Sequence, residues 1–195
     1  MMNDADADRG PIGYTLFDTT LGRAGVAWSV RGIVAVQLPE ANERETRVRL
    51  LERFPVTVSA EPPADVQLAI DGVVALLRGE RRDLSSAPVD MEGVPPFHQR
   101  VYEIARTIPP GRTLTYGAIA ARLGEPGASR AVGQALGHNP FVLVVPCHRV
   151  LAAGGRIGGF SASGGRVTKL RLLHIEGAQT SDQPSLFDPP VDAGH

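Results

Sequence analysis

The chain holds one sulfur nucleophile with a base beside it. Cys147 is the single cysteine among 195 residues, and His148 follows it directly in the string VVPCHRV. A thiol reacts as its thiolate, and a neighbouring base or cation lowers its pKa and so favours that form. The pair could therefore serve covalent chemistry in which sulfur attacks a substrate carbon.

Adjacency in the sequence does not by itself bring the two side chains together. Neighbours in extended backbone point to opposite sides, so a relay between Cys147 and His148 needs a turn at Cys147 or a bridging water. Pro146 fixes its own φ and favours a bend. Without one, the cysteine is more often a buried hydrophobe and the histidine an ordinary core residue. A histidine base also needs an orienting partner, and the acids of this half are the candidates: Glu103, Glu125 and Glu176.

A helical domain is predicted around this pair, over residues 96–177. A first helix starts near Pro96, with apolar residues at helical intervals, and stops at PPG. Two short helices follow in YGAIAARLG and SRAVGQALG, and Thr113 or Thr115 can cap the first. This succession is the helix-turn-helix pattern. The Gly-rich VLAAGGRIGGFSASGGRV resembles a wing or loop, and VTKLRLLHIEG closes the domain as a helix.

The second helix of that pair carries a row of small residues. If Val132 and Leu136 face the core, the outward row consists of Ser129, Gly133 and Gly137. Glycine costs about 1 kcal/mol relative to alanine inside a helix, so the row indicates close approach by another surface. That surface is either the narrow minor groove of DNA or another helix. Arg130, at the start of the helix, slightly favours DNA.

The N-terminal half is predicted to be a scaffold domain, residues 11–80. Three strands are expected in IGYTLFDT, GRAGVAWSV and RGIVAVQLP, as an antiparallel hairpin or meander. Two helices are expected in EANERETRVRLLERF and ADVQLAIDGVVALLRGE. Nothing here has the spacing of a catalytic constellation. Residues 1–10 are expected to be a disordered lead, and residues 81–95, rich in Pro, Ser and Asp, a linker.

Composition narrows the setting in which the protein works. A single cysteine excludes an internal disulfide and a multi-thiolate metal site, which favours a reducing, cytoplasmic compartment. No run approaches the roughly 18 apolar residues of a membrane span. The net charge of −1 hides a basic half, because residues 95–177 hold ten Lys and Arg against three Glu, a net +7. Such a half attracts polyanions, although a solvated charged face is the commoner explanation.

Five strings of the second half recur together in one protein family. They are TYGAIAARLG, SRAVGQALGHNP, VPCHRV, GGRIGGFS and LLHIEG, spread over residues 97–177. With them the chain closely resembles the O6-alkylguanine-DNA alkyltransferase family. The resemblance implies an α/β (α+β) fold, with a small N-terminal antiparallel sheet and helices in a ribonuclease H-like layout. A C-terminal winged helix-turn-helix domain would carry the active-site cysteine.

The implied function is direct-reversal DNA repair by a single-turnover methyltransferase. After base flipping, an alkyl group would pass irreversibly from guanine O6, or from thymine O4, to Cys147. His148 would act as the base through a water, and Glu176 would orient it. Tyr116 would donate its hydroxyl toward guanine N3.

The resemblance also implies the residues that hold the substrate and the DNA. Ser161 would sit by O6, the carbonyl of Val150 would read the exocyclic amine, and Asn139 would tie the helix pair to the cysteine loop. Phe160 stands where some relatives have tyrosine. Arg130 would enter the base stack, and the remaining minor-groove contacts would be Ala128, Ser129, Gly133 and Gly137.

No cofactor or metal is implied, and the expected partner is double-stranded DNA, bound by a monomer in a bacterial cytoplasm, at the nucleoid. Residues 178–195 are expected to be a disordered tail. Its QPSLF string, with Gln183, Leu186 and Phe187, resembles peptides that bind the replication sliding clamp. Alternatively, the apolar pair folds back onto the protein.

Two other functions remain open at this stage. One is a winged-helix DNA-binding regulator, or an alkyl-damage sensor that transfers nothing. The other is a cysteine hydrolase that uses Cys147 and His148.

Overall fold

The computed structural model describes residues 12–52, 54 and 57–180. The expected lead, residues 1–10, and the QPSLF string lie outside the described residues. Among those described, no helix is long and apolar enough to cross a membrane.

A four-stranded sheet forms the N-terminal half. It consists of β1 (Ile12–Thr19), β2 (Gly22–Ser29), β3 (Gly32–Gln37) and β4 (Thr57–Ser59), in the order β3-β2-β1-β4. The predicted antiparallel meander of β1 to β3 is confirmed. The sequence did not reveal β4, which pairs parallel to β1, so the sheet is mixed rather than purely antiparallel.

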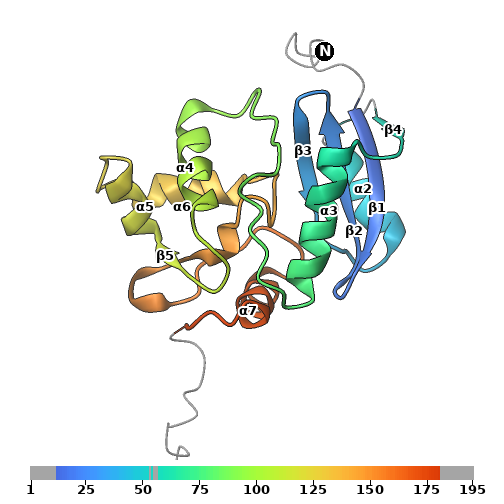
Figure 1. Ribbon diagram of the computed structural model, residues 1–195. Coiled ribbons are helices and arrows are strands. Elements are labelled where there is room, and N and C mark those ends of the chain that lie inside the picture. Colours follow the sequence, from blue (N-terminus) through green and yellow to red (C-terminus); the bar gives the residue numbers. More distant parts are fainter. Residues whose placement is uncertain (1–11, 53, 55–56, 181–195) are drawn as a thin grey trace, which may run out of the picture.

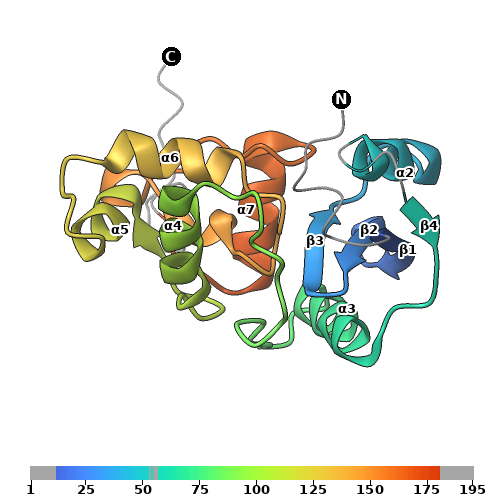
Figure 2. The same cartoon turned by 90° about the horizontal axis from the view of Figure 1, so that it is seen from above.

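Two helices cover opposite faces of this sheet, as the view from above shows (Figure 2). They are α2 (Glu43–Leu51) and α3 (Ala64–Leu77), in the two segments predicted to be helical. The Asn42 side chain caps α2 by accepting from the backbone N–H of Glu45. α3 buries Val66, Ile70 and Val73, which recur at helical spacing.

Helices dominate the C-terminal half, on the other side of the molecule in Figure 1. It contains α4 (Pro96–Arg106), β5 (Leu114–Thr115), α5 (Tyr116–Arg122), α6 (Ser129–Gly137), the 3-10 turn η1 (Cys147–Arg149), β6 (Val150–Leu151), the 3-10 turn η2 (Ala153–Gly155) and α7 (Gly165–Ile175). All four predicted helices are confirmed. Thr115, not Thr113, caps α5, because its hydroxyl accepts from the N–H of Ala118 at 3.0 Å.

The edge strand β3 joins the two halves. The N–H of Val36 donates to the carbonyl of Pro140 at 2.8 Å, and Ile33 pairs with Val89. Residues 88–90 of the predicted linker therefore run alongside β3. One buried cluster extends from Val26 in the sheet to Val150 beside the cysteine, so the halves share a core.

Candidate active site around Cys147

The η1 turn supplies the bend that a Cys–His relay requires. It begins after Pro146, and the N–H of Arg149 donates to the Pro146 carbonyl at 2.9 Å. Asn139 fastens the preceding loop, because its amide donates to the Val145 carbonyl at 2.8 Å and its oxygen accepts from the N–H of Phe141 at 2.9 Å. The end of α6 is thereby tied to the cysteine turn.

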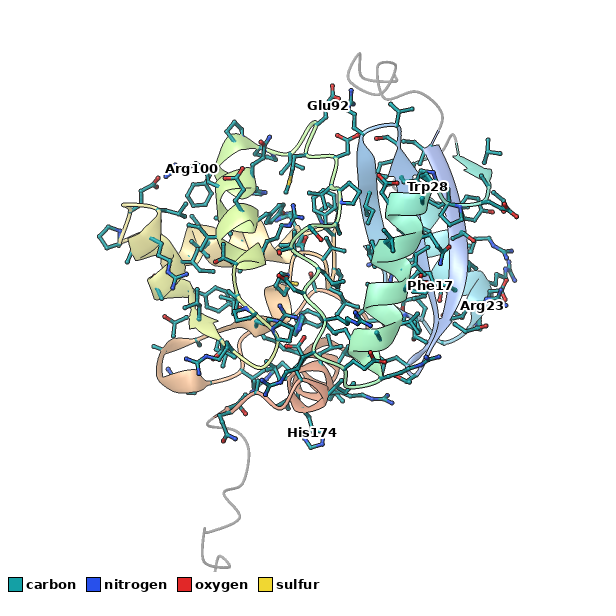
Figure 3. The ribbon with its side chains drawn as sticks, in the orientation of Figure 1. Phe17, Arg23, Trp28, Glu92, Arg100 and His174 are labelled. Carbon is teal, nitrogen blue, oxygen red and sulfur yellow. The ribbon has the colours of Figure 1, made fainter. Side chains whose placement is uncertain are left out.

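Of the three candidate orienting acids, the structure brings Glu176 to the histidine. The Nε2 of His148 lies 2.8 Å from the Glu176 carboxylate, and both side chains are buried. Glu103 is exposed on α4, and Glu125 pairs with Arg100 at 3.0 Å on the surface. Figure 3 shows Arg100 at the outer edge of the helical half.

The second ring nitrogen of His148 has no hydrogen-bond partner in the part of the chain that the structure describes. Because a carboxylate only accepts, Nε2 carries the proton and Nδ1 keeps its lone pair. Nδ1 is buried and makes no hydrogen bond to the described residues. Burial lowers the pKa of His148, although the hydrogen bond and charge of Glu176 raise it in part. The resting imidazole is thus a neutral base.

The thiol needs that base. Burial raises the pKa of Cys147, while the hydrogen bond from Asn139 and the charge of Lys169 oppose the rise. A fully protonated resting thiol follows, and the nucleophile forms only when its proton is removed.

Sequence reasoning missed Lys169 as part of this environment. Its buried ammonium donates to the Val150 carbonyl at 2.6 Å and lies 5.7 Å from the centre of the Tyr116 ring. Burial lowers its pKa to about 8, and negative charge on Cys147, once the thiolate forms, would raise it. The available signal was the stripe of α7, where Lys169 and Glu176 continue the buried face of Leu172 and Leu173. Figure 3 shows His174, by contrast, pointing outward at the end of α7.

Sequence reasoning also assigned no role to Arg149. Its guanidinium donates to Glu176 from Nε at 2.9 Å and from Nη2 at 2.8 Å, and its Nη1 donates to the Ile108 carbonyl at 2.5 Å. Burial alone would raise the pKa of Glu176, but the hydrogen bonds from His148 and Arg149 and the positive charge beside the carboxylate bring it down to about 2.

A cavity of about 560 Å³ opens onto Cys147. Predicted residues among its lining are Tyr116, Arg130, Gly133, Gly137, Phe160 and Ser161, and Gln134, Leu136 and Gly159 line it too. Burial raises the pKa of Tyr116, so its hydroxyl stays a donor. Asn139 and Val150 are buried and are not among the lining residues. Ala128 and Ser129 lie at the start of α6 but not among the lining residues, and the tail residues Gln183, Leu186 and Phe187 lie outside the described residues.

The row of small residues on α6 borders this cavity. Val132 and Leu136 are buried, as predicted, and Gly133 faces the Tyr116 ring. A Cβ atom at Gly137 would meet nothing within 4 Å among the described residues. The helix-packing alternative therefore does not account for Gly137.

The comparisons with known proteins agree with this geometry. A family model described as 6-O-methylguanine DNA methyltransferase, DNA binding domain, matches residues 96–178, which include every residue lining the cavity. The methylated-DNA–protein-cysteine methyltransferase of Mycobacterium tuberculosis is 40% identical over 146 residues, 73% of this chain and 86% of that protein. The chain belongs to the O6-methylguanine-DNA methyltransferase family.

Two further matches bear on DNA. The crystal structure of Mycobacterium tuberculosis OGT in complex with DNA has a TM-score of 0.67 and 34% identity, over 85% of this chain and 92% of that one. A DNA base-flipping protein of Thermus thermophilus is 45% identical over 134 residues, 67% of this chain and 87% of that protein.

Proposed function

We propose that the protein repairs DNA by moving the alkyl group of O6-alkylguanine irreversibly onto Cys147. It would be a methylated-DNA–protein-cysteine methyltransferase that acts once per chain. One observation carries the proposal: Cys147 lines a cavity with Tyr116, and the next residue, His148, forms a buried pair with Glu176.

In the proposed reaction, the thiol proton moves through a water to Nδ1 of His148. The sulfur attacks the alkyl carbon, and the S–C bond forms as the C–O6 bond breaks. Tyr116 donates its proton to guanine N3, so that guanine leaves neutral, and Tyr116 regains a proton from His148. The thiol proton has then replaced the alkyl group on guanine. The thioether does not hydrolyse, and the chain has no second cysteine to resolve it.

We infer that α5 and α6 act as a helix-turn-helix and the Gly-rich segment before α7 as its wing. The small residues Ser129, Gly133 and Gly137 of α6 would enter the minor groove from the start of the helix at Ala128, and Arg130 would fill the stack left by the flipped base. The net charge of +7 over residues 95–177 supports DNA as the partner. The strand order, with β4 parallel to β1, supports the ribonuclease H-like layout.

Inside the cavity, Ser161 would sit by O6 and Phe160 would border the base. The Val150 carbonyl, which accepts from Lys169, would read the exocyclic amine with its second lone pair. Asn139 would keep the cysteine loop in place. Thymine O4 is the second candidate site of damage.

A damage sensor that transfers nothing is the second candidate, because the base flipping named for the Thermus thermophilus relative would serve detection as well as transfer. Duplex DNA with radiolabelled O6-methylguanine separates the two. We expect label on the protein, saturating at one methyl per chain and absent in Cys147→Ser. A sensor would leave the label on DNA, and a hydrolase would release more than one equivalent.

We infer further that the protein acts as a monomer in a bacterial cytoplasm, and that QPSLF binds the sliding clamp through Leu186 and Phe187. A clamp pull-down should retain the wild type and lose Leu186→Ala/Phe187→Ala. Equal retention of the wild type and the variant would contradict clamp binding through Leu186 and Phe187.

A further inference from the structure

Glu176 occupies a costly position for a carboxylate. It caps the C-terminal end of α7, where the helix dipole is negative, and its side chain is 1% exposed. A buried charge of this kind persists only when it is paired and hydrogen-bonded. His148 is neutral at rest and supplies a hydrogen bond but no charge. Arg149 is the cation that contacts Glu176 among the described residues.

The contacts fix both carboxylate oxygens. Oε1 accepts from His148 Nε2 and Arg149 Nη2, each at 2.8 Å. Oε2 accepts from Arg149 Nε at 2.9 Å and from the Gly111 N–H at 3.3 Å. This two-point geometry is the one that a planar guanidinium matches and an ammonium does not. The third Arg149 nitrogen holds the Ile108 carbonyl, so three chain segments meet at one carboxylate.

We propose that Arg149 is a positioning residue of the transfer reaction. Its guanidinium keeps Glu176 ionised and oriented, so that the imidazole of His148 stays a neutral base with Nδ1 free to take the thiol proton. This inference rests on the proposed function, because it concerns the same site and the same proton.

The surrounding charges agree with this role. His148 feels the anion Glu176 and the cations Arg149 and Lys169, and Arg149 is also within electrostatic reach of Asp83. Arg149 offsets part of the attraction that Glu176 alone would exert on an imidazolium. Without Arg149, the pKa of His148 would be higher, so at a given pH a larger fraction of the ring would already be protonated and unable to accept the thiol proton.

Two substitutions separate charge from geometry. Arg149→Lys keeps the charge and loses the two-point contact, whereas Arg149→Met loses both. The matched control is Arg106→Met, since Arg106 is a half-buried arginine that bonds backbone carbonyls at Ser85 and Ala87. Each variant is assayed from pH 5 to 9 for single-turnover methyl transfer from labelled duplex and, without DNA, for alkylation of Cys147 by iodoacetamide. Thermal melting and the labelled fraction report folding.

We expect Arg149→Lys to keep the acid limb of the wild-type rate profile while its plateau rate falls by about tenfold or more. In Arg149→Met the acid limb should move up by about one pH unit. Arg106→Met should change neither. If Arg149→Met does not melt cooperatively, the proposal is tested by Arg149→Lys alone. A wild-type plateau rate in Arg149→Lys would then overturn the proposal.

A lower labelled fraction with wild-type rates in the remaining chains would also overturn it, because that is a purely structural effect. The iodoacetamide profile keeps the two proposals apart. If the wild type transfers no methyl group but the alkylation profile of Arg149→Met shifts from that of the wild type as described, the proposed function is wrong, and Arg149 still positions the base that activates Cys147.

Discussion

The Nε2 of His148 and the Oε1 of Glu176 lie 2.8 Å apart although 28 residues separate them in the chain. The η1 turn brings one group and the end of α7 brings the other. Because the contact occupies Nε2, the ring presents its unbonded Nδ1 as the basic atom.

Removing the charge of Glu176 should slow the chemistry. Glu176→Gln keeps the size of the side chain but no longer stabilises an imidazolium, so we expect the single-turnover transfer rate to fall roughly a hundredfold. It also leaves Arg149 buried without its anion, which should lower the melting temperature. Rapid-quench transfer assays and thermal melts measure the two effects. An unchanged rate in Glu176→Gln would refute a catalytic role for this contact.

The same carboxylate should make stability depend on pH. The folded pKa of Glu176 is about 2, below the ordinary 4.5, so its contribution is fully present above pH 4.5. That contribution should be lost as the pH falls from 4.5 toward 2. Urea unfolding at several pH values measures it, with Glu176→Gln as the comparison. Equal slopes for the two proteins in this window would contradict the assignment.

The position of the Tyr116 hydroxyl should depend on Gly158. A Cβ atom there would lie 2.9 Å from that hydroxyl and 3.1 Å from the ring. We expect Gly158→Ala to displace the donor and slow transfer by about tenfold or more. Gly127→Ala is the matched control, since its Cβ would meet nothing within 4 Å among the described residues and Gly127 does not line the cavity. Equal rates in the two variants would show that Tyr116 tolerates the displacement.

The role proposed for Arg130 predicts a difference between substrates. Arg130→Ala should slow transfer from duplex DNA by roughly tenfold, because the flipped state loses the side chain that fills its gap. Transfer from free O6-methylguanine base should change little. Arg122→Ala, at the exposed end of α5, controls for the loss of one positive charge. Equal losses on both substrates would place Arg130 in the chemistry instead.

Local patterns predicted most elements of this fold. Apolar periodicity and capping residues located the helices, and strings such as VPCHRV located the site. The strand β4 was not predicted because it has only three residues and pairs with a strand that is distant in the sequence, and no local pattern encodes such a pairing. The bend at Cys147 could only be stated as a requirement.

The buried charged groups near the cysteine were even harder to predict from the sequence. Arg149 and Lys169 look like ordinary surface cations in the sequence, where isolated Lys and Arg are mostly solvated. Their burial depends on partners such as Glu176 and the Val150 carbonyl, which lie 19 to 27 residues away. A polar residue within the apolar stripe of α7 was the one local clue.

The hydrogen bond from the Val36 N–H to the Pro140 carbonyl ties the sheet to the loop before Cys147, so neither half can be replaced by the corresponding half of an unrelated protein without loss of this contact. A chimera that joined residues 96–178 to an unrelated sheet would lose the strand edge against which the loop before Cys147 is laid. Residues 96–178 are therefore not a self-contained unit, because the N-terminal half supplies the strand edge that holds the loop before Cys147.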